Sequence, residues 1–128
     1  MTRSELASII DHTLLKPQAV SDDIEKLCKE VLQYGFASVC VNPIWVLMAS
    51  DILVESESLV CSVIGFPLGS TNCMSEEAGK AVADGAGELD MVLPVGLLKS
   101  GYTKKTADCI RSVVRESAGR PVKVILET

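Results

Sequence analysis

Five ionisable side chains stand in segments of the chain that otherwise read as buried. They are Asp11, Glu88, Asp90, Lys123 and Glu127. Taking a charge out of water is unfavourable unless the charge is paired, so we expect these side chains to meet in a polar cavity. A carboxylate beside an ammonium can pass protons between a bound substrate and an ordered water. The alternative is a structural ion-pair network, or strand ends that reach solvent.

Lys123 is also a candidate nucleophile, because desolvation can depress the pKa of a lysine enough for its amine to attack a carbonyl. Pairing with Asp90 or Glu127 would instead raise that pKa, and we expect the paired state. Cys40 lies in another aliphatic run. A cysteine in such a run is more often a small buried residue than a reactive thiol.

The segments that carry these residues alternate between strand and helix patterns. Strands are predicted at residues 9–15, 36–41, 59–64, 88–93 and 122–127, and helices at residues 3–9, 21–34, 43–54, 73–84 and 103–117. Short strands separated by helices indicate right-handed βαβ units, and hence a parallel sheet covered by helices. The fold class is α/β with a short leading helix. Spacing alone leaves a doubly wound sheet and an incomplete (β/α)8 barrel open.

In both architectures, chemistry gathers at the carboxyl ends of the strands. Because alternate residues of a strand share a face, Asp11 lies on one face with Thr13, and Cys40 lies on one face with Asn42. These positions are therefore candidates for contact with a substrate, together with Asp90 and its neighbours.

Composition excludes several classes of protein. The formal net charge of −5 disfavours a generic nucleic-acid or membrane-surface binder. The five cysteines show no Cys-x-x-Cys spacing and the only histidine is His12, which argues against a disulfide framework and a structural zinc site. No apolar run approaches the length of a membrane span. We expect a cytoplasmic protein with no metal and no cofactor.

Five motifs, in this order and spacing, closely resemble the N-terminal part of the deoxyribose-phosphate aldolase family. They are Asp11-His-Thr-Leu-Leu-Lys-Pro17, Val39-Cys-Val-Asn-Pro43, Val63-Ile-Gly-Phe-Pro-Leu-Gly69, Glu88-Leu-Asp-Met-Val92 and Lys123-Val-Ile-Leu-Glu-Thr128. The resemblance covers essentially the whole chain. It implies a (β/α)8, or TIM, barrel, and a class I lyase that cleaves 2-deoxyribose 5-phosphate to glyceraldehyde 3-phosphate and acetaldehyde through a lysine Schiff base, without a metal.

The resemblance also assigns roles to individual positions. Asp90 matches the family's strand-four aspartate, which relays protons to the Schiff-base intermediate, and Lys123 matches a strand-five lysine of the same cavity. Asp11, Cys40 and Asn42 match positions near the substrate. In the family, the Schiff-base lysine lies on strand six, a second lysine lies on strand seven, and the phosphate-binding loops follow strands seven and eight.

A barrel of this kind needs about 250 residues, and residues 1–128 would form a single incomplete unit of five strands, a partial or half-type TIM barrel. Two functions are compatible with such a unit. It is either the first part of an aldolase, inactive until strands six to eight are supplied, or a non-catalytic half-barrel that associates with itself. Because an open sheet leaves bare edges, we expect self-association, in its most specific form a homodimer that covers the open face.

Overall fold

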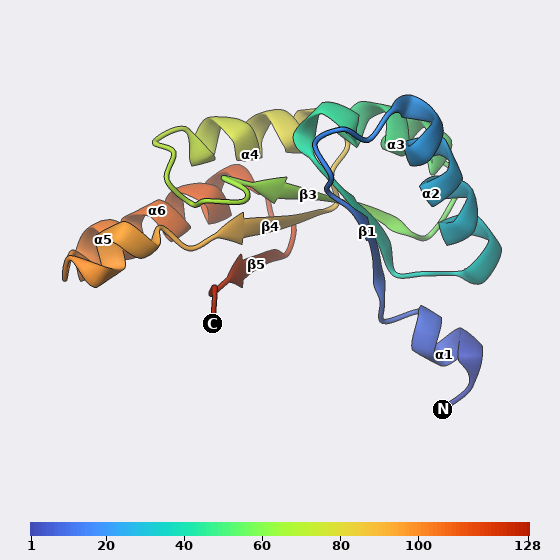
Figure 1. The fold of residues 1–128 in the computed structure, drawn as a ribbon, viewed down its shortest axis with the longest axis horizontal. Helices are drawn as coiled ribbons and strands as arrows, with labels where there is room; N and C mark the ends of the chain where they lie inside the picture. Colours follow the sequence, from blue (N-terminus) through green and yellow to red (C-terminus); the bar gives the residue numbers. More distant parts are fainter.

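The computed structural model describes residues 1–128 as one parallel sheet with helices packed mainly on one face (Figure 1). The strands are β1 (Asp11–Leu14), β2 (Ser38–Val41), β3 (Leu59–Ile64), β4 (Glu88–Val92) and β5 (Val122–Ile125). The helices are α1 (Arg3–Ala7), α2 (Ser21–Tyr34), the 3-10 turn η1 (Pro43–Trp45), α3 (Val46–Ile52), α4 (Met74–Ala83), α5 (Val95–Lys99) and α6 (Thr103–Glu116).

Each strand pairs in parallel with the strands next to it in the sequence, giving the order β1-β2-β3-β4-β5. This order is that of a barrel wall, in which successive βα units add to one growing edge. A doubly wound sheet would instead reverse direction at a switch point. The structure therefore confirms the α/β fold and the partial-barrel prediction, and the spacing ambiguity is resolved in favour of the barrel.

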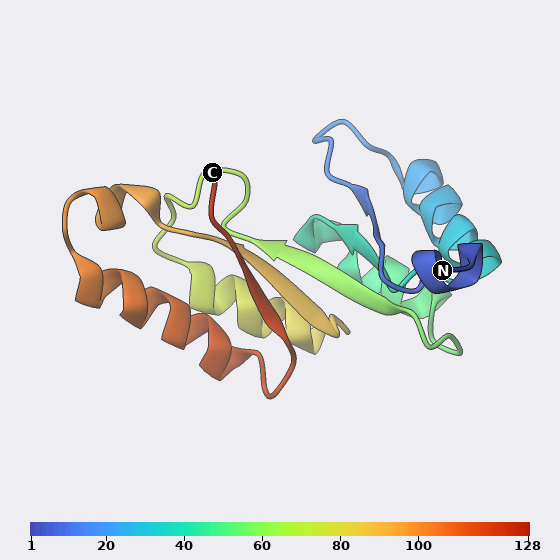
Figure 2. The ribbon, with the colours of Figure 1, turned by 90° about the horizontal axis from the view of Figure 1, so that it is seen from below.

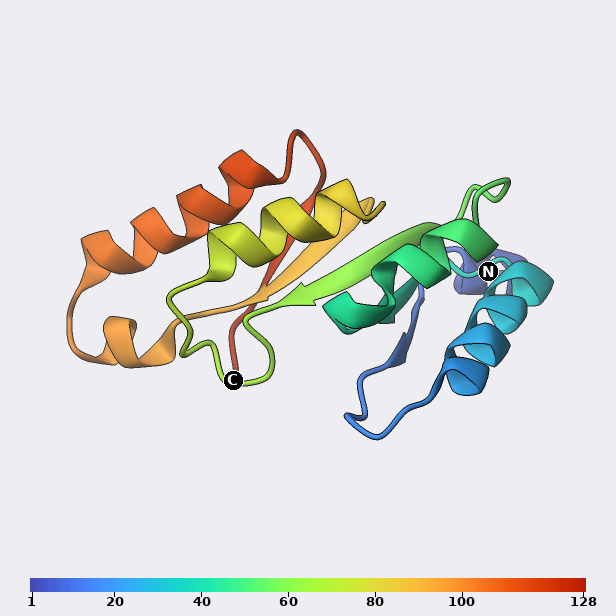
Figure 3. The same ribbon diagram turned by 90° about the horizontal axis from the view of Figure 1, so that it is seen from above.

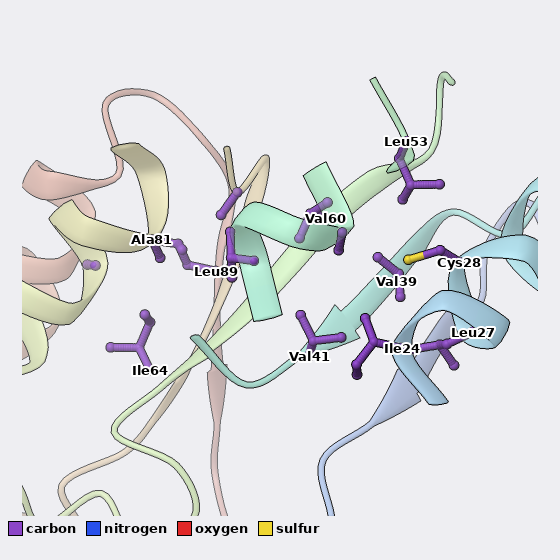
Figure 4. Packing of buried hydrophobic residues seen from close by; sticks show 14 of the residues in the cluster. Ile24, Leu27, Cys28, Val39, Val41, Leu53, Val60, Ile64, Ala81 and Leu89 are labelled. Carbon is purple, nitrogen blue, oxygen red and sulfur yellow. The ribbon is translucent and has the colours of Figure 1, made fainter. Parts of the chain in front are cut away.

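The main hydrophobic core lies between the sheet and the helices. Ile24 and Val31 of α2 are fully buried against the outward-facing side chains of β2, Val39 and Val41, and Figure 4 shows part of this packing. Further along the sheet, Leu89 of β4 belongs to the same cluster, and α4 packs beside α6 (Figure 3). Burying one such aliphatic side chain stabilises the fold by roughly 1.5–3 kcal/mol.

The helix predicted at residues 21–34 forms as α2 with those bounds, and its two ends are capped differently. Gly35 terminates α2 with a φ of 70°, a left-handed conformation that glycine adopts without strain. At the N-terminus, Ser21 is the first helical residue and Val20 occupies the cap position. The carboxylate of Asp23 accepts the Val20 amide hydrogen bond at 2.9 Å, so the capping oxygen comes from inside the helix.

Two other elements differ from the sequence prediction. Residues 43–54 do not form one helix, because Pro43 begins a 3-10 turn and the α-helix runs only over Val46–Ile52. The helix α5 (Val95–Lys99) was not expected, since its five residues give too short a pattern to detect. The remaining boundaries agree to within about two residues, the usual uncertainty of helix and strand ends.

The opposite face of the sheet carries the polar side chains. In Figure 2, β4 and β5 have no helix in front of them on this side. We call this the concave face, and define it by Asp11, Ser38, Cys40, Cys61, Val63, Glu88, Asp90 and Lys123, the side chains that β1 to β5 direct away from the main core. None of the helices is long and apolar enough to cross a membrane.

Candidate functional site

The amine of Lys123 lies at the centre of the concave face, among three carboxylates. Its Nζ is 2.6 Å from Oδ2 of Asp11 and 3.3 Å from Oδ1 of Asp90. It is 3.6 Å from Oε2 of Glu88. Asp90 and Lys123 are direct partners in the β4–β5 ladder, so their side chains emerge side by side from adjacent strands. The structure thus brings together the two residues predicted to be catalytic.

Asp11 extends this cluster across the sheet. Its Oδ1 accepts a hydrogen bond of 2.7 Å from the hydroxyl of Ser38, its register partner on β2. Burial raises the pKa of the Asp11 carboxyl, but the hydrogen bonds from Lys123 and Ser38 and the charge of the ammonium outweigh burial, so the pKa lies below its ordinary value. Asp11 is therefore a stable anion at neutral pH.

A nucleophilic lysine needs a lowered pKa, but the surroundings of Lys123 raise the pKa of its amine. Burial lowers the pKa of the amine, but the hydrogen bond to Asp11 and the charges of Asp90 and its neighbours raise it by more, leaving the pKa above its ordinary value. The side chain is 45% exposed, and the amine is held as an ammonium. This agrees with the expectation of a paired lysine. Asp90 is one partner, as expected, and Asp11 and Glu88 are the others. Glu127, the other expected partner, lies beyond the end of β5 and forms no ion pair.

Asp90 has one oxygen that is poorly satisfied. Its Oδ1 is buried and lies within ion-pair distance of Lys123, but it accepts no hydrogen bond. A buried carboxylate oxygen without a hydrogen bond is a high-energy acceptor, ready to bind a water or another donor that enters the site.

Cys40 and Cys61 form a thiol pair beside these charges. They are direct partners in the β2–β3 ladder, and both are buried. Together with Val63 they form a small cluster on the concave face, against which Leu15 and Phe66 pack. A hydrogen bond from the Cys61 thiol lowers the pKa of Cys40, and the same bond, with burial, raises the pKa of Cys61. Cys40 is thus buried as expected, but it does not stand alone.

Asn42 differs from the other candidate substrate-binding residues. Its amide Nδ2 donates a 3.2 Å hydrogen bond to the carbonyl of Leu15, which follows β1. Asn42 therefore ties together the two chain segments that leave the carboxyl ends of β1 and β2. Its side chain holds the rim of the site, whereas Asp11 and Cys40 lie on the concave face.

The loop after β3 is a connecting turn. The amide of Gly65 donates to Oε1 of Glu77 on α4 at 3.3 Å, and the amide of Gly69 donates to the Gly65 carbonyl at 2.7 Å. Both glycines have a φ of 64°, a conformation that other residues adopt with strain. Because these two amides are already occupied, they are not free to bind an anion.

Sequence reasoning missed one member of the concave face. Cys61 was not proposed as a site residue, although it alternates with Val63 on the strand at residues 59–64. The register that places it opposite Cys40 is a tertiary property, which period-2 alternation within one strand does not encode. Glu88 shares the face of Asp90 and could be found by the same alternation.

Two curated relatives illustrate what the chain is similar to in sequence. The deoxyribose-phosphate aldolase 1 of Bacillus licheniformis is 51% identical over 127 residues, which are 97% of this chain and 57% of the relative. The deoxyribose-phosphate aldolase of Clostridium kluyveri is 51% identical over 131 residues, which are 100% of this chain and 60% of the relative. No family model matches the chain.

Solved structures agree with the sequence relatives. A candidate deoxyribose-phosphate aldolase from Coccidioides immitis superposes with a TM-score of 0.96 at 38% identity, covering all of this chain and 51% of that protein. The tetrameric deoxyribose phosphate aldolase of Aeropyrum pernix gives a TM-score of 0.84 at 33% identity, covering 98% of this chain and 54% of that protein.

The likeness extends over nearly every residue of the chain in both sequence and structure, and the chain spans 57–60% of the length of the curated relatives described above. The strand order, the concave polar face and these relatives lead to the same assignment. In sequence and in structure, the chain is similar to deoxyribose-phosphate aldolases along nearly its whole length, and it corresponds to a little more than half of the length of those relatives.

Proposed function

We propose that residues 1–128 form the proton-transfer half of an aldolase site that cleaves 2-deoxyribose 5-phosphate to glyceraldehyde 3-phosphate and acetaldehyde. The observation that carries this proposal is the contact of Lys123 with Asp90 and Asp11 on the concave face, at 3.3 and 2.6 Å. The names of the sequence relatives support the reaction class.

In this proposal, Asp90 moves protons and Lys123 positions it. A carbinolamine must lose water and an enamine must exchange a proton, and a carboxylate with an unoccupied oxygen can hold the water that does so. Lys123 holds the Asp90 carboxylate in place by an ion pair from the next strand. Asp11 holds Lys123 from the far side, and Cys40 lies beneath the substrate position.

The Schiff base itself requires a neutral amine. Lys123 does not meet this requirement, because its ion pairs favour the ammonium form. We therefore propose that the nucleophile and the phosphate-binding groups come from strands outside the five described here, supplied either in the same polypeptide or by another one. Residues 1–128 alone should then form no covalent adduct with the substrate.

Borohydride trapping tests this proposal directly. The 128-residue chain is incubated with 2-deoxyribose 5-phosphate and sodium borohydride, and its intact mass is measured. The unmodified mass is expected. A reduced adduct that disappears in Lys123→Ala but persists in Lys105→Ala, a lysine on the outer helix α6, would make Lys123 the nucleophile and overturn the proposed division of roles.

A second function rests on the open sheet. β1 and β5 each pair with only one neighbour, and unpaired strand edges promote association. We propose as the alternative that the chain is a self-associating half-barrel, in its most specific form a two-fold homodimer that covers the concave face. The tetrameric relative from Aeropyrum pernix supports assembly in general. Sedimentation velocity at micromolar concentration should give a dimer or larger, and a compact monomer would contradict this alternative.

A further inference from the structure

We propose that Cys40, Cys61 and Asp90 form a binding site for one thiophilic divalent cation of the Zn²⁺ type. Their ligand atoms, two Sγ and one carboxylate oxygen, all lie within 4.8 Å of one another. The three residues come from the three adjacent strands β2, β3 and β4. No family relationship or aldolase chemistry requires this site, which is distinct from the proton relay proposed above although it shares Asp90.

Strand pairing brings the three residues close together although they are far apart in the sequence. Cys40 and Cys61 are 21 positions apart in the sequence but opposite each other in the β2–β3 ladder. Asp90 is opposite Val63, two positions beyond Cys61 on the same face. Side chains two positions apart on neighbouring strands can reach one another diagonally. Three donors therefore converge on one point of a rigid sheet, which favours a defined coordination geometry.

The dimensions suit a small thiophilic ion. Zinc binds thiolate sulfur at about 2.3 Å and carboxylate oxygen at about 2.0–2.2 Å. Two sulfurs on one ion are then less than about 4.6 Å apart, so donors already within 4.8 Å need only small side-chain rotations to close on it. Two thiolates select a soft or borderline cation over Mg²⁺ or Ca²⁺, which prefer all-oxygen ligands.

The charge of the surroundings favours a cation. Asp11, Glu88 and Asp90 bring three carboxylates to this face and Lys123 brings one ammonium. With three carboxylates and one ammonium, the cluster carries a formal net charge of −2. Asp90 Oδ1 is buried and, although it lies 3.3 Å from the ammonium of Lys123, it accepts no hydrogen bond, so a bound cation would add a ligand contact to it. Lys123 would keep Asp11 and Glu88 as partners.

Coordination is coupled to loss of the thiol protons, because a metal ion that binds one thiolate promotes loss of the proton from the other thiol. Three protein ligands leave a fourth position for water or another donor, as in open zinc sites. A bound ion would also withdraw Asp90 from Lys123, so occupancy would inhibit the proposed proton transfer.

Cobalt titration tests the site, because Co²⁺ replaces Zn²⁺ and reports its ligands by colour. The reduced 128-residue chain is titrated with Co²⁺ in the absence of oxygen. We expect a thiolate-to-cobalt charge-transfer band that saturates at one ion per chain and disappears when Zn²⁺ is added. Native mass spectrometry checks the stoichiometry. No substrate is present in the titration, so its result does not depend on the aldolase proposal. The aldolase proposal likewise does not depend on whether Co²⁺ binds.

Variants locate the ion. Cys61→Ser should abolish the band. Cys28→Ser, which removes an equally buried thiol on the helical side of the sheet, should retain it. Asp90→Asn should weaken Co²⁺ binding at least about tenfold, the smallest loss expected even for an outer ligand partner. A band that survives Cys61→Ser, or a folded chain without a band, would overturn the proposal.

The variant Asp90→Asn also guards against misfolding as an explanation. If circular dichroism shows that Cys61→Ser is unfolded, the decision passes to Asp90→Asn, which keeps both thiols and nearly the same volume. Unchanged Co²⁺ affinity in a folded Asp90→Asn chain would remove the carboxylate from the site and overturn the three-ligand proposal. A weakened affinity with the thiolate band still present would support it.

Discussion

Lys123 and Asp11 form a 2.6 Å ion pair between the last and the first strand of the sheet. In a flat sheet these two strands would be about 19 Å apart, four strand spacings of about 4.8 Å. One ion pair cannot span that distance. The sheet must therefore curl until its edges approach each other across the concave face, which is the curvature of a barrel wall.

The first prediction concerns Lys123→Met. Removing the ammonium leaves three carboxylates facing one another, so the free energy of unfolding at pH 7 should fall by about 1 kcal/mol, the upper range for a partly exposed ion pair. The matched control is Lys80→Met, because Lys80 pairs with only one carboxylate, that of Asp84. Urea denaturation measures both. Equal losses would mean that the three-carboxylate cluster adds nothing, and high salt should reduce the difference.

The second prediction concerns acid stability. The pKa of Asp11 is lower in the folded protein than its ordinary value of 3.8. A carboxyl with a depressed folded-state pKa stabilises the fold above its unfolded-state pKa, and the contribution is lost as pH falls through the folded-state value. The difference in unfolding free energy between the wild-type chain and Asp11→Asn should therefore be constant near neutrality and shrink below about pH 4.

Denaturation of both proteins at a series of pH values measures this difference. Asp23→Asn, which removes the capping carboxylate of α2, serves as a control for general acid effects on a carboxylate far from Lys123. A difference between wild type and Asp11→Asn that stays constant down to the acid transition would contradict the ion-pair origin of the stabilisation.

The third prediction concerns the turn after β3. A Cβ at Gly69 would lie 2.4 Å from the carbonyl oxygen of Leu93, and the residue has a φ of 64°. Gly119 has a φ of 85° but no atom within 4 Å of such a Cβ. Both substitutions to alanine introduce left-handed strain of about 1 kcal/mol, and Gly69→Ala adds a backbone clash. It should lose about 1–3 kcal/mol more than Gly119→Ala.

Thermal or urea unfolding compares the two glycine variants, and similar losses would show that the loop moves freely away from Leu93. The comparison isolates the close approach of two segments at the carboxyl ends of β3 and β4. Both glycines have a positive φ, so the left-handed strain that alanine introduces is similar at the two positions and largely cancels when the two free energies of unfolding are compared.

The fourth prediction separates the roles of two carboxylates on β4. Fusing residues 1–128 to the remaining part of the Bacillus licheniformis relative would supply the rest of the proposed site. In that fusion, Asp90→Asn should lower kcat by roughly 100-fold or more, the usual contribution of a positioned proton-transfer group. Glu88→Gln should lower it less than about tenfold, because Glu88 is farther from the amine of Lys123, at 3.6 Å.

A coupled assay that detects glyceraldehyde 3-phosphate measures both variants. Equal effects of the two substitutions would show that the charge of the cluster matters rather than the position of Asp90. The active fusion is itself the positive control, and it also tests whether the fold of residues 1–128 is preserved in the longer protein.

Alternation within single strands was enough to predict most of the site. Asp11, Asp90 and Lys123 were recognised because a charge in an aliphatic run must find a partner, and the structure pairs them. Strand positions were predictable because short apolar runs between helical segments are typical of buried strands. The pairing of Lys123 with Asp11 was less predictable, because Asp11 is 112 positions away and only the curl of the sheet brings it close.

Structural elements that show no repeating hydrophobic pattern in the sequence were missed. The five residues of α5 and the break between η1 and α3 depend on local packing and on Pro43 rather than on a repeated pattern. Cys61 was overlooked for a related reason, since its importance comes from its register with Cys40. Register is set by how two strands meet, and no property of either strand alone specifies it.

The strand order described above has a consequence for synthesis on the ribosome. Every strand pairs with strands adjacent in the sequence, so each βα unit finds its docking edge already present when it leaves the exit tunnel. Chains are made slowly, at about 5–20 residues per second, and fold from the N-terminus. The contact of Lys123 with Asp11 is different, because it joins strands that are not neighbours and forms only when β5 has emerged. Curvature of these five strands would thus be fixed by β5, the strand that also completes the charged cluster.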